Sequence, residues 1–206
     1  MAHASEPRFR VHHALRIKGF AKVDHLTGLA GLEESAVVDH LESMQQEGKT
    51  QFREARSLWQ LTPAGREAHP PLLEADAGRP GFRDGLATHY PNFIELNEEF
   101  KVLCGDWQLR EGAPNDHTDA SYDKGVLARL FKLDVNAQEI VGAFGHVADR
   151  FSGYSRRLVN SRLALEGGQR NMFTGVMVGS YHDIWMELHE DLILTQGISR
   201  SAEGSF

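Results

Sequence analysis

The side chains most capable of chemistry gather near the C-terminal end, in residues 180–191 (SYHDIWMELHED). His182 and His189 are seven residues apart, so on one helix they would share a face but stand about 10 Å apart along its axis. Ligands of one metal ion on a single helix come three or four residues apart, as in H-E-x-x-H. Paired-metal bundles use Glu-x-x-His, which does not occur in this half of the chain. The spacing therefore argues against a metal centre.

Two other interpretations of this cluster remain open. Asp183, Glu187 and Glu190 fall at i, i+4 and i+7, which favours an acidic helix face that is solvated or paired with Arg156 and Arg157. The alternative is a polar pocket for a small ligand. Its candidate ligand-binding residues are Trp107, His117, Tyr181, His182, Trp185 and His189.

Elsewhere, the polar residues have simpler explanations. The loop 115–119 (NDHTD) could offer ligands, but capping of a helix that starts near Ser121 or Tyr122 explains it better. The single cysteine, Cys104, falls beside an apolar helical seam and is expected to be inert. The motifs of serine hydrolases, P-loops, dinucleotide sites and zinc proteases do not occur. The sequence therefore predicts no catalytic residues, no metal and no cofactor.

Composition narrows the class of protein. The chain has 206 residues, 41% of them hydrophobic, with 22 Lys and Arg against 29 Asp and Glu. One cysteine permits no intramolecular disulfide and no cysteine-rich zinc site. The N-terminus lacks the apolar core of a signal peptide, and no apolar run is long enough to span a membrane. We expect a cytoplasmic protein with no membrane partner.

A stretch rich in proline and glycine divides the chain. Residues 70–91 hold four of the seven prolines and are predicted to be a linker with at most short turns. The predicted domains are therefore residues 1–69 and 92–206. The net charge of -7 belongs to the part after residue 69, because residues 1–69 hold nine basic and nine acidic residues.

The N-terminal part changes its hydrophobic period along its length. Helical spacing gives way to alternation over residues 50–61, which predicts a short hairpin. The pair Thr62-Pro63 combines a capping residue with proline at the first helical position, so another helix is expected there. The three helices predicted before the hairpin are 9–20, 22–30 and 33–47.

This order of elements is that of a winged helix-turn-helix domain. The run 59–66 (WQLTPAGR) resembles the junction after the wing in MarR-like and PadR-like transcriptional regulators, and the resemblance covers residues 8–69. It implies that the 33–47 helix enters the DNA major groove and that the hairpin reaches the backbone or minor groove. The DNA-binding residues would be Ser35, Asp39, His40 and Ser43 on the helix and Lys49, Arg53 and Arg56 on the wing.

The 33–47 helix departs from that pattern by its charge. It carries five carboxylates and no Lys or Arg. Facing them toward a polyanion is unfavourable, so a winged helix that contacts a partner protein remains an alternative.

The C-terminal part is predicted to be an antiparallel helical bundle. Residues 92–109 place apolar side chains at alternating spacings of three and four, as in a bundle seam. Further helices are expected from residue 122 to a break near Asp134, over 135–166, and over 175–196. The fold class is mainly α: a winged helix-turn-helix of three helices and a two-stranded wing, then the bundle.

A second resemblance covers most of the chain. The pieces 106–110, 115–117 and 180–192 resemble the C-terminal extension of actinobacterial phosphoenolpyruvate-utilising, dikinase-like proteins, but the chain lacks a phosphotransfer domain. The resemblance implies an accessory or regulatory module.

The leading hypothesis is a homodimeric transcriptional regulator that binds DNA and responds to a small-molecule effector. Its rivals are a module that contacts a phosphoenolpyruvate-utilising enzyme and, third, a helical-bundle enzyme or metal-binding protein.

Overall fold

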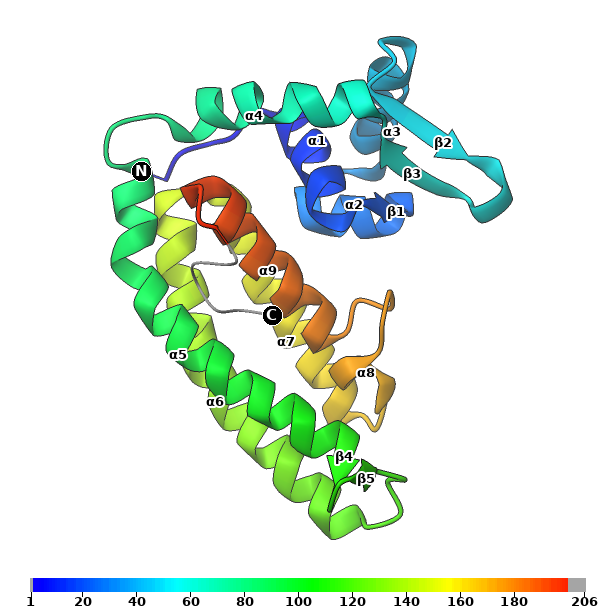
Figure 1. The fold of residues 1–206 in the computed structure, drawn as a ribbon, viewed down its shortest axis with the longest axis vertical. Helices are drawn as coiled ribbons and strands as arrows, with labels where there is room; N and C mark the ends of the chain where they lie inside the picture. The colour runs from blue at the N-terminus through cyan, green and yellow to red at the C-terminus, as the bar shows by residue number, and fades with distance from the viewer. Residues whose placement is uncertain (1, 200–206) are drawn as a thin grey trace.

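Helices make up most of the computed structural model, which describes residues 2–199 (Figure 1). Residues 7–77, here called the helix–hairpin segment, sit on one end of the longer helices (Figure 1). Its elements are α1 (Pro7–Lys18), β1 (Phe20–Ala21), α2 (Val23–Ala30), α3 (Glu34–Gln46), β2 (Thr50–Arg53), the 3-10 turn η1 (Glu54–Arg56), β3 (Leu58–Leu61) and α4 (Pro63–Ala77).

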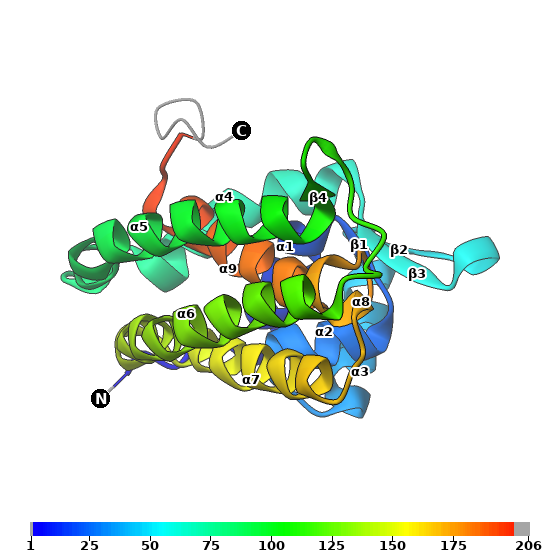
Figure 2. The same cartoon turned by 90° about the horizontal axis from the view of Figure 1, so that it is seen from below.

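The strands of this segment form one small antiparallel sheet in the order β1-β3-β2. Thr50 pairs with Leu61 and Arg53 pairs with Leu58, so β2 and β3 form a hairpin closed by η1. The hairpin projects away from the rest of the molecule (Figure 2).

Local sequence signals set the ends of these helices, as predicted. Gly19 follows α1 with φ of 73°, a conformation that glycine adopts without a Cβ clash. Thr62 caps α4, because its Oγ1 accepts a hydrogen bond from the Gly65 amide at 3.1 Å. The hairpin and the helices on both sides of it are confirmed.

The expectation that residues 70–91 hold at most short turns is wrong. α4 continues through Pro70 and Pro71 to Ala77, and α5 begins at Phe82. Side chains on the inner face of α4, including Leu73 and Ala77, are buried. We attribute the persistence of the helix to this packing, which outweighs the intrinsic cost of the prolines.

The second group of elements, residues 82–196, is here called the bundle. Two long helices, α5 and α6, lie side by side and carry α7 and α9 against them (Figures 1 and 2). Its elements are α5 (Phe82–Gln108), β4 (Leu109–Arg110), β5 (Ala113–Pro114), α6 (Ala120–Val147), η2 (Asp149–Phe151), α7 (Ser152–Glu166), α8 (Asn171–Thr174) and α9 (Tyr181–Gln196).

Two predicted boundaries in the middle of the bundle are wrong. α6 does not break near Asp134, because the buried carboxylate accepts a hydrogen bond from the Tyr181 hydroxyl at 2.9 Å and pairs with Arg162 at 3.0 Å. The chain breaks instead at Ala148, between α6 and η2. There His3 forms a bridge, with its amide bonded to the Val147 carbonyl at 2.9 Å. The N-terminal segment therefore occupies the break.

The helix expected over 175–196 begins later. Ser180 caps α9 by accepting from the Asp183 amide at 3.1 Å, so residues 175–180 form a loop. Met177 lies in this loop with φ of 61° and is largely exposed, not in the predicted helical seam.

Candidate functional site

α3 is held by one buried face and leaves the other open. Val37, Leu41 and Met44 are buried against the rest of the helix–hairpin segment. On the opposite side, Ser35 and Asp39 are exposed, while His40 and Ser43 are half-buried. The sequence-predicted DNA-binding residues of α3 therefore lie on its accessible side.

The predicted cation at the end of this helix is already paired. Lys49 Nζ lies 2.8 Å from Glu47, whose other oxygen receives Arg8 Nη2 at 2.5 Å. The hydrogen bonds from Arg8 and Lys49 lower the pKa of Glu47 to about 2. Arg8 Nη1 also donates to Ser43 Oγ at 3.3 Å, so one guanidinium joins α1 to α3.

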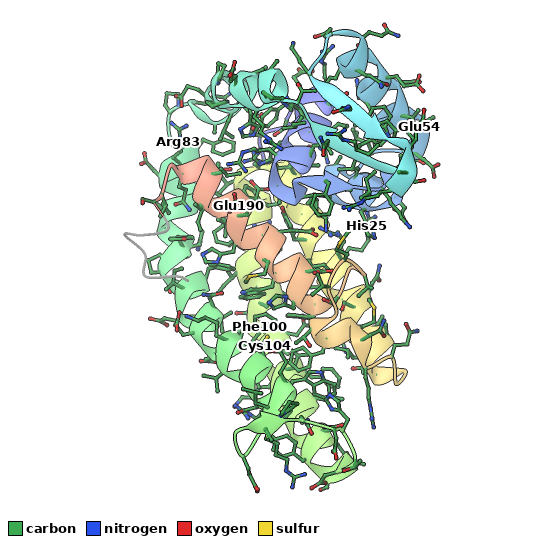
Figure 3. All side chains as sticks on the ribbon, turned by 45° about the vertical axis from the view of Figure 1, so that its right-hand side comes forward. His25, Glu54, Arg83, Phe100, Cys104 and Glu190 are labelled. Atoms are coloured by element: carbon green, nitrogen blue, oxygen red, sulfur yellow. The ribbon has the colours of Figure 1, made fainter. Side chains whose placement is uncertain are left out.

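The hairpin carries the remaining predicted cations. Arg53 and Arg56 are both exposed. Between them in the chain, Glu54, labelled in Figure 3, begins the turn η1 that closes the hairpin. The rings of Phe52 and Trp59 lie 5.2 Å apart across β2 and β3, a cross-strand contact that stabilises the hairpin. The tip thus presents two exposed guanidinium groups.

The outer face of α3 is acidic. Glu34, Asp39 and Glu42 are exposed, and α3 contains no Lys or Arg. Carboxylates repel phosphates but accept hydrogen bonds from the cytosine amino group in the major groove.

The six predicted ligand-binding residues do not form one site. Trp107 and His117 lie together at the far end of the bundle, with ring centroids 4.4 Å apart. There His117 Nδ1 lies 3.1 Å from Asp123, and Asn115 bonds to both groups. This pair closes the loop that leads into α6.

Three of the other four residues fill the bundle core. Tyr181, Trp185 and His189 are buried on α9. Trp185 stacks on Phe93 and donates from Nε1 to Asn97 Oδ1 at 3.0 Å. The rings of Tyr181 and Trp185 lie 6.3 Å apart, and all three side chains are buried in the bundle core, so their role in ligand binding stays a prediction.

Of the six predicted ligand-binding residues, His182 is the one that lines an open groove. This groove lies beside the loop 175–180 and has a volume of about 370 Å³. Its Nδ1 is buried without a hydrogen-bond partner, and burial lowers the pKa of the ring. His182 therefore faces different surroundings from the other five predicted residues.

The carboxylates of the acidic α9 stripe have different partners. Asp183 accepts from the Val178 and Gly179 amides at 3.0 and 3.1 Å, and Glu190 lies 3.5 Å from Arg16. Glu187 is buried and receives Lys18 Nζ at 2.6 Å and Arg157 Nη2 at 2.5 Å. The predicted pairing with Arg157 is confirmed at Glu187, while the predicted pairing with Arg156 stays a prediction. Lys18 of α1 is a partner that spacing within the bundle could not reveal.

A chain of buried polar groups joins the helix–hairpin segment to the bundle, and sequence reasoning missed it. His13 bonds to His69 at 2.8 Å and to Asp191 at 2.9 Å. Arg150 lies 3.3 Å from Asp191 and 2.9 Å from Asp76. These five residues, called the buried junction below, come from α1, α4, η2 and α9.

Burial and mutual contact shift the titration of this junction. Burial lowers the pKa of His69 to about 3, and His13 adds to the effect. Burial alone would raise the pKa of Asp191, but Arg150 and His13 outweigh it and hold that pKa well below its usual range. Asp191 is therefore charged and His69 neutral near pH 7. The high share of histidine before residue 70 was the only signal in the sequence.

The remaining candidates have structural roles. Asp119 caps α6 by accepting from the Ser121 and Tyr122 amides, each at 3.0 Å, which confirms the capping interpretation. Burial raises the pKa of the Cys104 thiol to about 12, so it is unreactive near neutral pH. Within residues 2–199, no group of three His, Cys, Asp or Glu could hold a metal ion.

Comparisons with known proteins assign no role to any of these residues, so their roles are inferred from geometry. No protein-family model, curated protein or solved structure matches this chain. Over the part of the chain that the structure describes, no helix is long and apolar enough to cross a membrane.

Proposed function

We propose that this protein is a DNA-binding transcriptional regulator whose helix–hairpin segment is a winged helix-turn-helix. In this proposal α3 is the recognition helix and the β2–β3 hairpin is the wing. The observation that carries it is the open face of α3, which lies beside a projecting hairpin with Arg53 and Arg56 exposed. A helix face and a cationic arm on one surface suit a groove and its adjacent phosphates.

The charges define how this surface would bind. Arg53 and Arg56 would contact phosphates, whereas Asp39, together with Ser35, His40 and Ser43, would contact base edges. Because the acidic side chains of α3 repel the DNA backbone, we expect weak binding to random sequence and a strong dependence on the two wing arginines.

The rest of the proposal concerns assembly and location. The bundle would pair two copies, so that two α3 helices meet a two-fold operator, and a small-molecule effector would adjust their affinity. Such a regulator would act in the cytoplasm.

The test is a mobility-shift selection with fragments of the source genome at low salt. We expect a subset of fragments to bind at submicromolar protein, and Arg53→Ala/Arg56→Ala to abolish the shift. Arg129→Ala is the matched control, because Arg129 is an exposed arginine of the bundle that pairs with Asp106. Failure of every fragment to bind at micromolar protein would refute the proposal.

The acidic face of α3 favours a second candidate, in which the segment contacts a partner protein. Glu34, Asp39 and Glu42 would meet a basic surface on a phosphoenolpyruvate-utilising enzyme. Co-purification of such an enzyme with the wild-type chain, lost in the Glu34→Gln/Asp39→Asn/Glu42→Gln variant, would support this candidate. Retention of the enzyme by that variant would exclude α3 as the contact.

A further inference from the structure

A groove on the helix–hairpin segment has the size of a small-molecule site. It measures about 470 Å³ and lies between the N-terminal segment, α1, the end of α3 and α4. Ligand pockets typically range from about 300 to 1,000 Å³. The groove does not include the outer face of α3, and it shares one residue, Asp76, with the buried junction.

The floor of the groove is apolar. Phe9 and Met44 are buried beneath it, and Ala75 and Leu72 form one wall. Leu72 is 38% exposed, so part of its apolar side chain is in contact with water. His12 is also buried there, and its Nε2 is bonded to the Gly65 carbonyl at 2.7 Å. An apolar body would remove Leu72 from water.

The rim of the groove is charged and carries side chains of both signs. Arg8, Lys49 and Arg79 line it, together with Glu6 and Glu47. Asp76 is buried and already bound by His3 at 2.8 Å and Arg150 at 2.9 Å. Burial is the largest cause that lowers the pKa of His12 at the floor of the groove. The positive charges of Lys49 and Arg8 lower this pKa further, so they act on the floor of the groove.

Glu47 occupies the position that an external anion would take. Its two oxygens bind Arg8 at 2.5 Å and Lys49 at 2.8 Å, so the two cations converge on one carboxylate at the groove edge. Glu47 is exposed, and a ligand carboxylate can replace it without leaving a buried charge unpaired.

We propose that this groove binds a small amphiphilic anion, with its apolar body over Phe9, Met44 and Leu72 and its carboxylate on Arg8 and Lys49. A neutral molecule of the same shape would gain the apolar contacts alone.

The position of Glu47 links this site to α3. Glu47 is the residue that ends α3, and Arg8 also donates to Ser43 on the last turns of that helix. An anion that takes Arg8 and Lys49 releases both restraints on the end of α3. The ligand would thereby alter DNA affinity, a consequence that rests on the proposed function, whereas the binding site itself does not.

Calorimetric titration of the full chain with octanoate tests the site without DNA. We expect a dissociation constant of about 0.1 to 1 mM, as suits an anion of this size. Octanamide, which has the same body without the charge, and acetate, which has the charge without the body, should each bind at least about tenfold more weakly.

Variants give effects of opposite sign. Arg8→Gln and Lys49→Gln should each weaken octanoate binding about fivefold, whereas Glu47→Gln should tighten it, because both cations lose their internal partner. Leu72→Ser should weaken octanoate and leave acetate unchanged. Arg129→Gln is the control and should change nothing.

Two results would overturn the proposal. One is no detectable heat or thermal stabilisation by octanoate up to about 10 mM. The other is octanoate binding that neither Arg8→Gln nor Glu47→Gln changes in folded protein, as checked by circular dichroism. If octanoate binds as expected while no DNA fragment is retained, the groove stands and the DNA proposal fails.

Discussion

The outer face of α3 and the buried junction both carry several charged side chains. On α3 these side chains are exposed, whereas in the junction they are buried and paired. On α3, Glu34, Asp39 and Glu42 are exposed and α3 supplies no cation. In the junction, Asp191 meets His13 at 2.9 Å and Arg150 at 3.3 Å, out of contact with water.

The contrast separates a surface open to a partner from an internal joint. Buried charges are costly unless each one is paired, so the junction specifies how α1 and α4 sit on α9. The exposed carboxylates of α3 are in contact with water and do not need a paired partner within the protein. Changes in the junction should therefore affect folding, whereas changes on α3 and the hairpin should affect binding.

The largest effect is expected from Asp191→Asn. The substitution removes the shared partner of His13 and Arg150 and leaves buried positive charge partly uncompensated. We expect the free energy of unfolding to fall by about 3 to 5 kcal/mol in urea denaturation. Glu98→Gln, in an exposed pair with Lys101, is the control and should cost less than about 0.5 kcal/mol. A loss below about 1 kcal/mol for Asp191→Asn would show that the junction does not hold the two parts together.

The second test uses pH. The pKa of His69 is about 3 in the folded protein and about 6.5 when unfolded, so between these values only the unfolded chain binds the proton. Stability should be unaffected by this residue above about pH 6.5 and should fall below it, by up to about 1.4 kcal/mol per pH unit.

Unfolding measured between about pH 6 and pH 5 checks this slope, because most carboxylates remain charged there. His69→Gln should flatten the slope, whereas His146→Gln, at an exposed site on α6, should not. An unchanged slope in His69→Gln would mean that His69 titrates as it does in the unfolded chain.

A smaller effect is expected where the hairpin meets α4. Thr62 Oγ1 accepts from the Gly65 amide at 3.1 Å and donates to the Gly48 carbonyl at 2.6 Å. Thr62→Ala should lower the free energy of unfolding by about 1 kcal/mol. Thr88→Ala, whose hydroxyl bonds only to the Asp84 carbonyl within α5, provides the comparison. Equal losses in both variants would argue against a capping role for Thr62.

The two regions also differ in how far the sequence predicts them. The helices before the hairpin and the start of α4 follow from local signals, such as Gly19 and the Thr62 cap, and these predictions are confirmed. The prolines at 70 and 71 misled the prediction because burial of α4 is a tertiary effect.

The junction could not be derived from spacing, since its partners are distant in the chain. His13 and Asp191 are separated by 178 residues, and Arg150 and Asp76 by 74. The break at Ala148 has the same origin, because it depends on His3 from the N-terminal segment. The predicted residues Trp107 and His117 do meet, but Tyr181, Trp185 and His189 belong to the core.

The most direct test of the central proposal is the salt dependence of DNA binding by the wild-type chain and Arg53→Ala/Arg56→Ala. Fluorescence anisotropy with one retained genomic fragment would give the association constant at several salt concentrations. Loss of two phosphate contacts should reduce the slope of log K against log salt by about 1.8. The same slope and affinity in both proteins, with Arg129→Ala as the reference, would contradict the assignment of the hairpin as a DNA-binding wing.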